Sequence, residues 1–358
     1  MITGSHNPKN YNGVKLIIND KPISGSEIYK LINQSKNQSD CAGKILKVDI
    51  KDIYIKEVIN NIKIKGEEKL KVVIDCGNGA AGCIAPRLYR ELGCEVVELF
   101  TEIDGNFPNH HPDPGKLENL SYLINKVKSS KADLGLAFDG DGDRVGLVSN
   151  KGDVVFPDKI MMILSQDILS KKKGSIIFDV KCSNALPDII KSLNGTPIMS
   201  PTGHFHIKNA IREHNPLLAG EMSGHIFFND KWYGFDDGHY SGARIIELIT
   251  KNDKSISEIS HSYGKFFSTP ELNINTTDDR KFEIVEEFSE NFSLSGEKVT
   301  IDGLRVNFDN GWALLRASNT TPKLVLRFEG DSQEDLDNIK KSFLDELSRI
   351  CPDIDINL

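Results

Sequence analysis

The stretch Lys71-Val-Val-Ile-Asp-Cys-Gly-Asn-Gly-Ala-Ala-Gly82 decides the fold class of this 358-residue chain. A short apolar run that ends in an acidic residue and a glycine-rich turn is typical of a buried strand leading into a helix. Similar apolar runs occur at 134–138, 175–180 and 217–220, and helical patterns separate them. Strands that alternate with helices in this way predict α/β layers around a largely parallel sheet.

The pattern changes near residue 268. Before that point, the strands suggest two related α/β units in tandem, the first of which ends in a hairpin formed by 145–148 and 154–156. After it, short strands are expected at 298–301, 304–308, 312–316 and 323–328, followed by one terminal helix at 332–348. This arrangement predicts a separate α+β module at the C-terminus.

Composition narrows the classes of protein that fit. Lys and Arg number 44 against 52 for Asp and Glu, and this net charge of -8 disfavours a protein that coats nucleic acid. The sequence has no apolar run of about 18 residues, so no membrane partner is expected. Its six cysteines include no Cys-x-x-Cys pair, which fits a reducing cytoplasm better than a zinc cage or a disulfide scaffold.

The densest chemical signal is Asp-Gly-Asp-Gly-Asp-Arg at 139–144, directly after an apolar run. Three carboxylates on a short, glycine-rich loop suit a hard cation such as Mg²⁺ or Ca²⁺. An EF-hand would need Gly at its sixth position and an acid at its twelfth, where this chain has Arg144 and Asn150. The alternative is a solvated acidic turn, but three neighbouring like charges are costly without a cation.

Three further loops carry polar groups. Thr-Gly-Ser-His-Asn-Pro at 3–8 places a hydroxyl nucleophile beside an imidazole, although these residues are also common in ordinary turns. Gly-Glu-Met-Ser-Gly-His at 220–225 can accept from one sugar hydroxyl and donate to another, while its histidine alone is more often structural. Arg-Ala-Ser-Asn-Thr-Thr-Pro at 316–322 suits a phosphate or, equally, a polar hairpin turn.

The glycines at 77–82 form a competing motif. They match Gly-x-Gly-x-x-Gly after a strand, and Glu98 lies near the end of the next strand, as in dinucleotide-binding folds. Glycines at these positions also simply allow a strand and a helix to pack closely. The motif alone is therefore weak evidence. A nicotinamide enzyme would also have no use for a loop of three carboxylates.

Taken in order, the four polar loops resemble those of the α-D-phosphohexomutase family, most closely its bacterial phosphomannomutase/phosphoglucomutase branch. The resemblance covers nearly the whole chain and includes two more stretches, at 104–114 and 232–238. One hexapeptide of this kind arises easily by chance, whereas the ordered set does not. The resemblance implies tandem mixed α/β domains of phosphohexomutase type with a C-terminal α+β domain.

The resemblance also implies a role for each loop. Ser5 would carry the phosphoryl group and contact the metal, and Asp139, Asp141 and Asp143 would be the Mg²⁺ ligands. Lys15 is the implied general base, His6 adjoins the phosphoserine, and His225 is a second acid–base candidate. The implied substrate-binding residues are Arg144, Lys181, Thr202, Gly203, His204, Glu221, Ser223, Arg316, Ser318, Asn319 and Thr320.

The implied reaction interconverts the 1-phosphate and the 6-phosphate of mannose or glucose. Phosphoserine 5 would donate its phosphoryl group to a hexose 1-phosphate and give the hexose 1,6-bisphosphate, which is also the activator. This intermediate would then rotate end over end within the site before its other phosphate returns to Ser5. Glu221 and Ser223 would hold the 3- and 4-hydroxyls in both orientations, while the loop from Arg316 grips phosphate. Phosphosugars are the expected partners, and the expected protein is a monomer.

The family places a long segment before the serine loop, which here begins at Thr3. The expected domains are therefore 1–50, a remnant of the first domain with the serine loop, 51–152 with the metal loop, 153–265 with the sugar loop, and 266–358 with the phosphate loop. Such a remnant is too small for a good core, so we expect an exposed apolar edge at 14–18 and a frayed Ser5. We interpret the chain as a truncated mutase.

Two alternatives remain at this point. One is a phosphosugar-binding remnant whose Ser5 is never phosphorylated, and the other is a nucleotide-linked dehydrogenase built on Gly77–Gly82. Within the family, a phosphoglucosamine or phosphopentose mutase is also possible, although Met222 favours the hexose branch.

Overall fold

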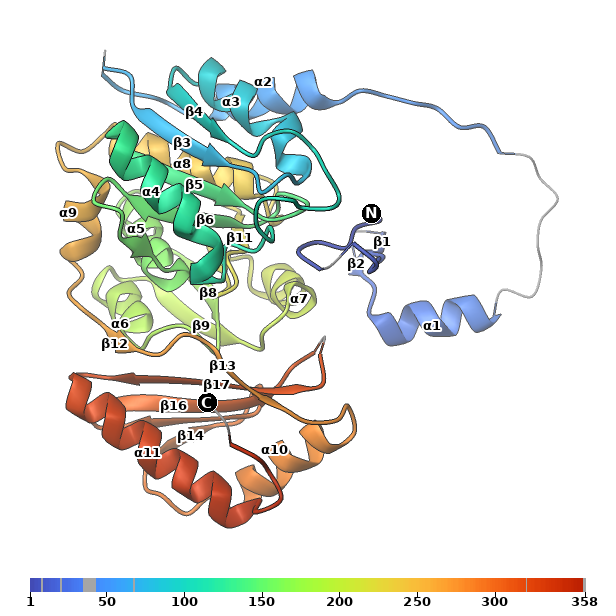
Figure 1. The fold of residues 1–358 in the computed structure, drawn as a ribbon, viewed down its shortest axis with the longest axis vertical. Coiled ribbons are helices and arrows are strands. Elements are labelled where there is room, and N and C mark those ends of the chain that lie inside the picture. Colours follow the sequence, from blue (N-terminus) through green and yellow to red (C-terminus); the bar gives the residue numbers. More distant parts are fainter. Residues whose placement is uncertain (8, 20, 35–42, 67, 320, 357–358) are drawn as a thin grey trace.

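The computed structural model describes residues 1–7, 9–19, 21–34, 43–66, 68–319 and 321–356, and Figure 1 shows their arrangement. Two α/β units are stacked in the upper part of that view, the C-terminal sheet and its helices lie below them, and an N-terminal arm lies to one side. Among the described residues, no helix combines the length and the apolar composition needed to cross a bilayer.

The first α/β unit is built on a sheet with the strand order β4-β3-β5-β6-β7. Its core strands are apolar and buried on both faces, as parallel strands covered by helices are. Strands β3 (Lys71–Asp75), β4 (Glu95–Leu99) and β5 (Leu134–Phe138) are parallel, and β6 (Val145–Ser149) and β7 (Val154–Val155) are the predicted antiparallel hairpin. The helices of this unit are α2 (Lys51–Asn61), η1 (Ala80–Cys83), α3 (Ala85–Glu91), η2 (Leu117–Leu120) and α4 (Ser121–Ser130).

The second unit repeats this plan with the strand order β11-β10-β8-β9. Strands β8 (Ser175–Asp179), β9 (Thr196–Ser200) and β10 (Leu218–Gly220) are parallel, and β11 (Ile226–Phe228) is antiparallel to β10. Its helices are α5 (Pro157–Leu169), α6 (Ala185–Ser192), α7 (His204–His214), α8 (Gly238–Ile249) and α9 (Ile256–His261). The sequence pattern predicted most of these elements but did not indicate β9, β11, α2 or α9.

The two α/β units share one hydrophobic core, which extends from Ile55 on α2 to Ile256 on α9. Every residue of α8 is buried, and this helix packs against β5 and β6 of the first unit as well as β11 of the second. Burial on all sides is typical of a helix in the middle of a large core. The site loops of both units are therefore held by one rigid framework.

The C-terminal module has a core of its own around an antiparallel sheet ordered β12-β17-β16-β15-β14, with β13 also paired to β17. The expectation of one helix here is wrong, because α10 (Arg280–Asn291) precedes the predicted terminal helix, α11 (Gln333–Ile350). The strands are β12 (Phe267–Ser268), β13 (Leu272–Asn275), β14 (Glu297–Val299), β15 (Leu304–Phe308), β16 (Gly311–Ala317) and β17 (Lys323–Gly330).

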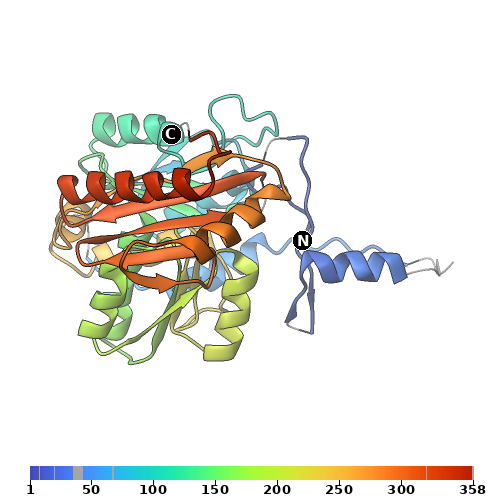
Figure 2. The same cartoon turned by 90° about the horizontal axis from the view of Figure 1, so that it is seen from below.

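The N-terminal arm begins with the serine loop and continues through the hairpin β1 (Ile17–Ile18) and β2 (Lys21–Pro22) to α1 (Gly25–Gln34). The strand expected at 14–18 is thus reduced to two residues. Helix α1 has no buried residue and points away from the body, as Figure 2 shows. Ile17 is 58% exposed, so the predicted apolar edge is present.

Candidate active site

The three aspartates of the metal loop converge directly after β5. Carboxylate oxygens of Asp139, Asp141 and Asp143 all lie within 4.8 Å of one another. Asp139 also shapes the loop, because its Oδ1 accepts hydrogen bonds from the backbone N–H groups of Gly142 and Arg144, both at 3.1 Å. The sequence therefore places all three carboxylates in one small volume, as predicted.

The chemistry of this group fits a hard cation. Oδ1 of Asp141 and Oδ1 of Asp143 are buried and have no hydrogen-bond partner among the described residues. Burial, together with the charge of Asp143, raises the pKa of Asp139 to about 7. A divalent ion with oxygen ligands would relieve both the repulsion and the unmet hydrogen-bonding demand, so the three carboxylates fit Mg²⁺.

Ser5 is held against this loop. Its Oγ donates to Asp139 Oδ2 at 3.1 Å and lies 3.1 Å from His6 Nδ1. The hydroxyl of Thr3 donates to Asp141 Oδ2 at 2.8 Å, which ties the segment down a second time. The sequence predicted a frayed Ser5, whereas the structure places this residue and Thr3 in direct contact with the metal loop.

The backbone at this contact is tight. Ser5 has a φ of 51°, in a left-handed region that residues other than glycine adopt at some cost, and that strain is typical of functional turns. On the other side of the contact, a Cβ at Gly140 would lie 2.2 Å from the carbonyl oxygen of Ser5. Only glycine at this position of the metal loop lets the serine loop approach so closely.

Lys15 pairs with two of the proposed metal ligands. Its Nζ lies 2.5 Å from Asp143 Oδ2 and 3.4 Å from Asp141 Oδ2. Burial disfavours the ammonium, but the two carboxylates outweigh it and raise the pKa of Lys15. A lysine held in its charged form neutralises part of the negative charge of the loop, and as a general base it would first have to lose this proton.

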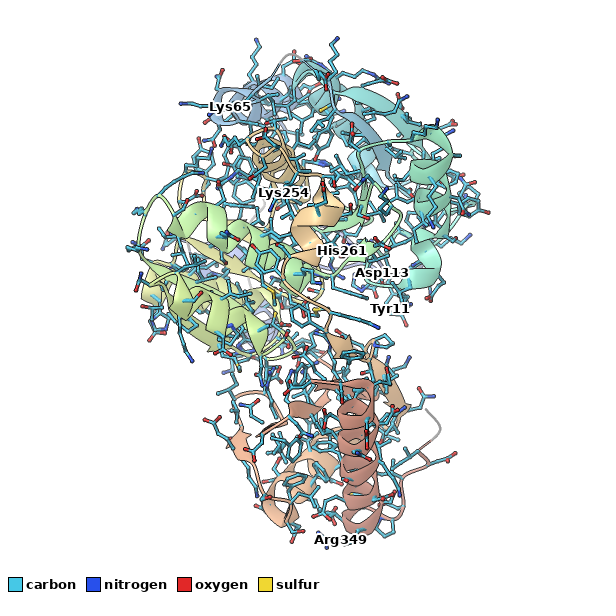
Figure 3. All side chains as sticks on the ribbon, turned by 90° about the vertical axis from the view of Figure 1, so that its left-hand side faces the viewer. Tyr11, Lys65, Asp113, Lys254, His261 and Arg349 are labelled. Carbon is cyan, nitrogen blue, oxygen red and sulfur yellow. The ribbon has the colours of Figure 1, made fainter. Side chains whose placement is uncertain are left out.

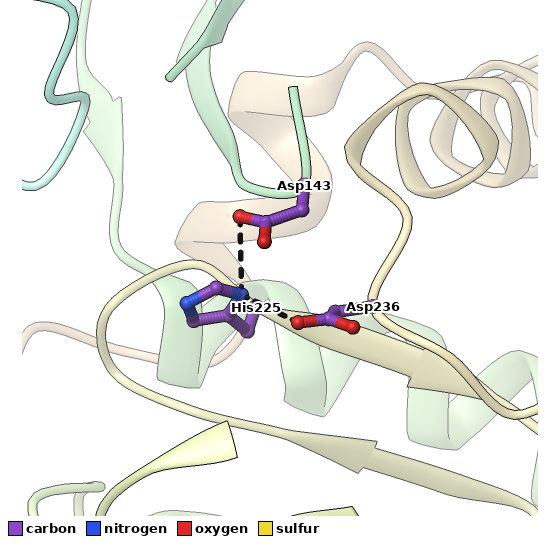
Figure 4. A group of neighbouring side chains, drawn as sticks. All are labelled: Asp143, His225 and Asp236. Atoms are coloured by element: carbon purple, nitrogen blue, oxygen red, sulfur yellow. Dashed lines mark ion pairs between the residues drawn. The ribbon is translucent and has the colours of Figure 1, made fainter. Parts of the chain in front are cut away.

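His225 lies between a cation and two carboxylates, and Figure 4 shows the carboxylate side of this arrangement. Its Nε2 accepts a hydrogen bond from Arg144 Nε at 3.0 Å, while its Nδ1 lies 3.4 Å from Asp143 and 3.2 Å from Asp236. Burial and Arg144 lower the pKa of His225, but the carboxylates more than compensate and raise it above its usual range. Asp236, which Lys208 contacts at 2.7 Å, was not predicted from the sequence.

The pKa of His6 is shifted in the opposite direction from that of His225. Burial and the nearby charge of Arg144 lower the pKa of His6 to about 4, so the ring is neutral at physiological pH. A neutral imidazole next to a serine hydroxyl can accept a proton. The structure therefore brings together Ser5, His6, Lys15, Arg144, His225 and the three aspartates.

The sugar loop meets the turn before α7. Glu221 is buried, its Oε1 accepts the backbone N–H of Gly203 at 2.6 Å, and its Oε2 has no partner among the described residues. Burial raises the pKa of Glu221. His204 follows Gly203 at the start of α7, where burial and Lys208 lower the pKa of His204 to about 4.

The phosphate loop meets the same turn from the C-terminal module. Asn319 Nδ2 donates to the carbonyl oxygen of Thr202 at 3.2 Å, and Ser318 Oγ lies 2.8 Å from Thr321 Oγ1. Arg316 is buried and its Nε donates to Asp302, a residue the sequence did not indicate. Thr320, predicted in this loop, lies outside the described residues.

Lys181 joins the second α/β unit to the C-terminal module. Its Nζ pairs with Glu271 at 2.5 Å and lies 3.8 Å from Asp179. Burial disfavours the charged form, but the two carboxylates raise the pKa of Lys181. Glu271 and Asp179 are further polar residues of this region that the sequence patterns did not single out.

A cavity of about 480 Å³ opens beside these groups. His6, Arg144, Met222 and Ser223 line it, together with Asp113, which Figure 3 shows near the junction of the α/β units with the C-terminal module. Such a volume is in the range of small-molecule sites, and polar groups from several loops converge on it.

The competing glycine motif at 77–82 packs against the metal loop. The N–H of Ala80 donates to the carbonyl oxygen of Gly140 at 2.8 Å. This contact favours the close-packing interpretation of these glycines over a dinucleotide site.

Comparisons with known proteins relate this chain to phosphoglucomutases and phosphomannomutases. Models of the α/β/α domains II and III of phosphoglucomutase/phosphomannomutase match residues 52–152 and 156–266, and the model of the C-terminal domain matches residues 271–346. A phosphomannomutase/phosphoglucomutase of Pseudomonas syringae is 51% identical over 99% of this chain and 77% of its own length. A phosphoglucomutase of Neisseria gonorrhoeae is 44% identical over 96% of this chain and 76% of its own length.

A comparison with solved structures points to the same family. A phosphoglucomutase/phosphomannomutase family protein of Burkholderia thailandensis superposes with a TM-score of 0.91 at 43% identity, covering 99% of this chain and 76% of that one. The matched region includes the sheets and the loops that build the site. The chain therefore belongs to the α-D-phosphohexomutase family, in its phosphoglucomutase/phosphomannomutase branch.

Proposed function

We propose that this chain interconverts the 1-phosphate and the 6-phosphate of glucose or mannose through a phosphoserine at Ser5. The observation that carries the proposal is the placement of the Ser5 hydroxyl 3.1 Å from Asp139, within a cluster of carboxylates that fits Mg²⁺. When bound, Mg²⁺ would supply charge stabilisation for the transferring phosphoryl group.

In the proposed reaction, the phosphorus–Oγ bond of phosphoserine 5 breaks while a bond forms to O6 of a hexose 1-phosphate. The O6 proton passes to a neighbouring base, for which His6, His225 and, once deprotonated, Lys15 are the candidates. Arg144 and Lys15 add positive charge near the transferring group, as phosphoryl transfer requires. The hexose 1,6-bisphosphate then turns end over end, and the bond between O1 and its phosphorus breaks while a bond to Ser5 Oγ forms. O1 takes up a proton, which leaves the hexose 6-phosphate.

Substrate binding is assigned to the other two loops. Glu221 and Ser223 would hold sugar hydroxyls. The buried Oε2 of Glu221 supports this role, because it accepts no hydrogen bond from the described residues and a sugar hydroxyl could donate one. Arg316, Ser318, Asn319 and Thr320 would hold the phosphate that is not being transferred. Lys181, Thr202, Gly203 and His204 would contact phosphate or sugar between these loops.

A coupled assay with Mg²⁺, a trace of glucose 1,6-bisphosphate and glucose 1-phosphate or mannose 1-phosphate tests this proposal. We expect turnover with the wild-type chain and a loss of at least about 1,000-fold in Ser5→Ala, because the nucleophile is removed. Ser129→Ala, in which an exposed hydroxyl on α4 is lost, should leave the rate unchanged.

The same assay separates the main alternative, a protein that binds phosphosugars but whose Ser5 is never phosphorylated. The N-terminal arm is the observation in its favour, because α1 has no buried residue to fix the arm in place. Intact-mass analysis would then find no phosphoryl adduct on Ser5, and glucose 1-phosphate would still bind without turnover.

We also propose the division into 1–50, 51–152, 153–265 and 266–358. The breaks between the matched ranges support it, as does the separate core of the C-terminal module. A cytoplasmic location is supported by the five described cysteines, none of which forms a disulfide. The proposed monomeric state can be checked by light scattering.

A further inference from the structure

Asp302 contacts two parts of the proposed substrate site at once. Its Oδ2 accepts a hydrogen bond from Arg316 Nε and another from the backbone N–H of Thr202, each at 2.9 Å. Arg316 lies on β16 of the C-terminal module, whereas Thr202 precedes α7 in the second α/β unit. One carboxylate oxygen thus joins the phosphate-binding loop to the other half of the site.

The backbone fixes the position of this carboxylate. Gly303, the next residue, has a φ of 75°, and a Cβ there would lie 2.2 Å from the carbonyl oxygen of Leu315 and 2.7 Å from Arg316 Cα. The turn that carries Asp302 is therefore pressed directly against β16 at Arg316. Glycine is required for that approach.

The contact determines how Arg316 can present itself. The guanidinium is planar, so binding its Nε to Asp302 fixes the plane of the group. Nη2 of Arg316 is buried and has no hydrogen-bond partner among the described residues. This Nη2 group is thus left to donate to an anion such as a phosphate.

The same contact reaches the sugar loop through two successive backbone N–H groups. Thr202 N–H donates to Asp302, and Gly203 N–H donates to Glu221. Asn319 reinforces the bridge, because its side chain donates to the carbonyl oxygen of Thr202. The turn at 202–203 is therefore held between two carboxylates, that of Asp302 in the C-terminal module and that of Glu221 in the sugar loop.

We propose that Asp302 is a positioning residue, which sets the orientation of Arg316 and its separation from Glu221 so that both ends of a hexose phosphate are bound together. This inference rests on the proposed function. If the negative charge of Asp302 instead competed with phosphate for Arg316, its removal would strengthen binding. The two effects differ in sign, so binding measurements decide between them.

The test compares Asp302→Ala and Asp302→Asn with the wild-type chain. Calorimetry gives the Kd for glucose 1-phosphate in the presence of Mg²⁺, and the coupled assay gives KM and kcat separately. We expect Kd and KM to rise about 30-fold in Asp302→Ala, because two hydrogen bonds to a charged acceptor are lost. Asp302→Asn keeps an oxygen acceptor and should recover part of that loss, to roughly fivefold.

The value of kcat should stay within about threefold, because a phosphate held away from the reacting atoms contributes equally to ground and transition states. Asp309→Asn, an exposed change in the same module, is the matched control and should leave all three constants unchanged. Circular dichroism checks that each variant is folded.

Tighter binding in Asp302→Ala would overturn the proposal in favour of competition. Unchanged Kd and KM, or a lower kcat at unchanged KM, would leave Asp302 with a merely structural role and also overturn it. A wild-type chain that binds glucose 1-phosphate without turning it over would contradict the proposed function alone, since Kd still reports on Asp302. A wild-type chain that does not bind the sugar phosphate would contradict both.

Discussion

His239 illustrates how one buried side chain couples stability to pH. It lies at the start of α8, with its ring 4.9 Å from that of Phe138 and 6.3 Å from that of Tyr54. Burial alone lowers the pKa of His239 to about 4, from an ordinary value of 6.5. Protonation therefore favours the unfolded chain, so the stabilisation from His239 is complete above pH 6.5 and is lost as the pH falls towards 4.

We predict that this loss amounts to about 3 kcal/mol of unfolding free energy. Urea unfolding of the wild type and of His239→Asn at pH 7.5 and pH 4.5 measures it, because the variant lacks the titrating group. The wild type should lose more stability than the variant between the two pH values. An equal loss in both proteins would show that His239 is not held neutral.

At this scale, residue spacing alone predicted contacts within one loop, whereas contacts between distant loops, such as that of Ser5 with Asp139, were expected only from the family resemblance. Asp139, Asp141 and Asp143 form one loop, so their convergence was predictable from glycine spacing. The role of Asp302 was not predictable in this way, because it depends on a contact with Arg316, from which it is separated by a turn and a strand. Asp236 likewise gains its significance only from its approach to His225.

The C-terminal helix α11 shows what a single cap contributes to an element. Ser332 precedes the helix, and its Oγ accepts the backbone N–H of Asp335 at 3.1 Å, which satisfies a donor that has no partner within the helix. Leu336, Phe343 and Leu347 then pack α11 onto the core of the C-terminal module. Loss of the cap should therefore weaken this module.

We predict that Ser332→Ala lowers the unfolding free energy of the C-terminal module by about 1 kcal/mol. Hydrogen exchange of amides in α11 and β16 measures the change locally. Ser348→Ala, an exposed change on the same helix, should have a smaller effect. A loss no larger than that of the control would mean that the cap does not stabilise the module.

The elements that were missed have physical explanations. Helix α10 buries only Lys281, Ile284 and Phe288, so its apolar stripe is narrow and the charged residues around it hide the pattern. Strand β11 has three residues, and it directly follows the polar sugar loop. By contrast, β3, β5 and β8 were predictable because both of their faces are covered, which makes their central residues a continuous apolar run.

At the scale of the molecule, the site depends on an arm that lies outside the shared core. No residue of the arm belongs to a described core cluster, yet the arm carries Ser5 and Lys15 to the metal loop. Described residues between the arm and α2 are exposed, Ile45 by 90% and Leu46 by 85%. Residues 43–50 form no helix or strand. Cleavage there would separate the nucleophile from the rest of the site.

We predict that brief trypsin treatment cuts first after Lys44 or Lys47, because exposed chain without backbone hydrogen bonding enters a protease most easily. The large fragment should still bind glucose 1-phosphate, since it contains Glu221 and Arg316. It should not catalyse the reaction, because it lacks Ser5. Mass spectrometry identifies the cut, and calorimetry measures the binding. The double variant Lys44→Gln/Lys47→Gln should slow the cut without changing the activity of the uncut chain. First cleavage within the α/β body would instead show that the segment before α2 is covered in solution, and the arm would then have to be regarded as a packed part of the molecule.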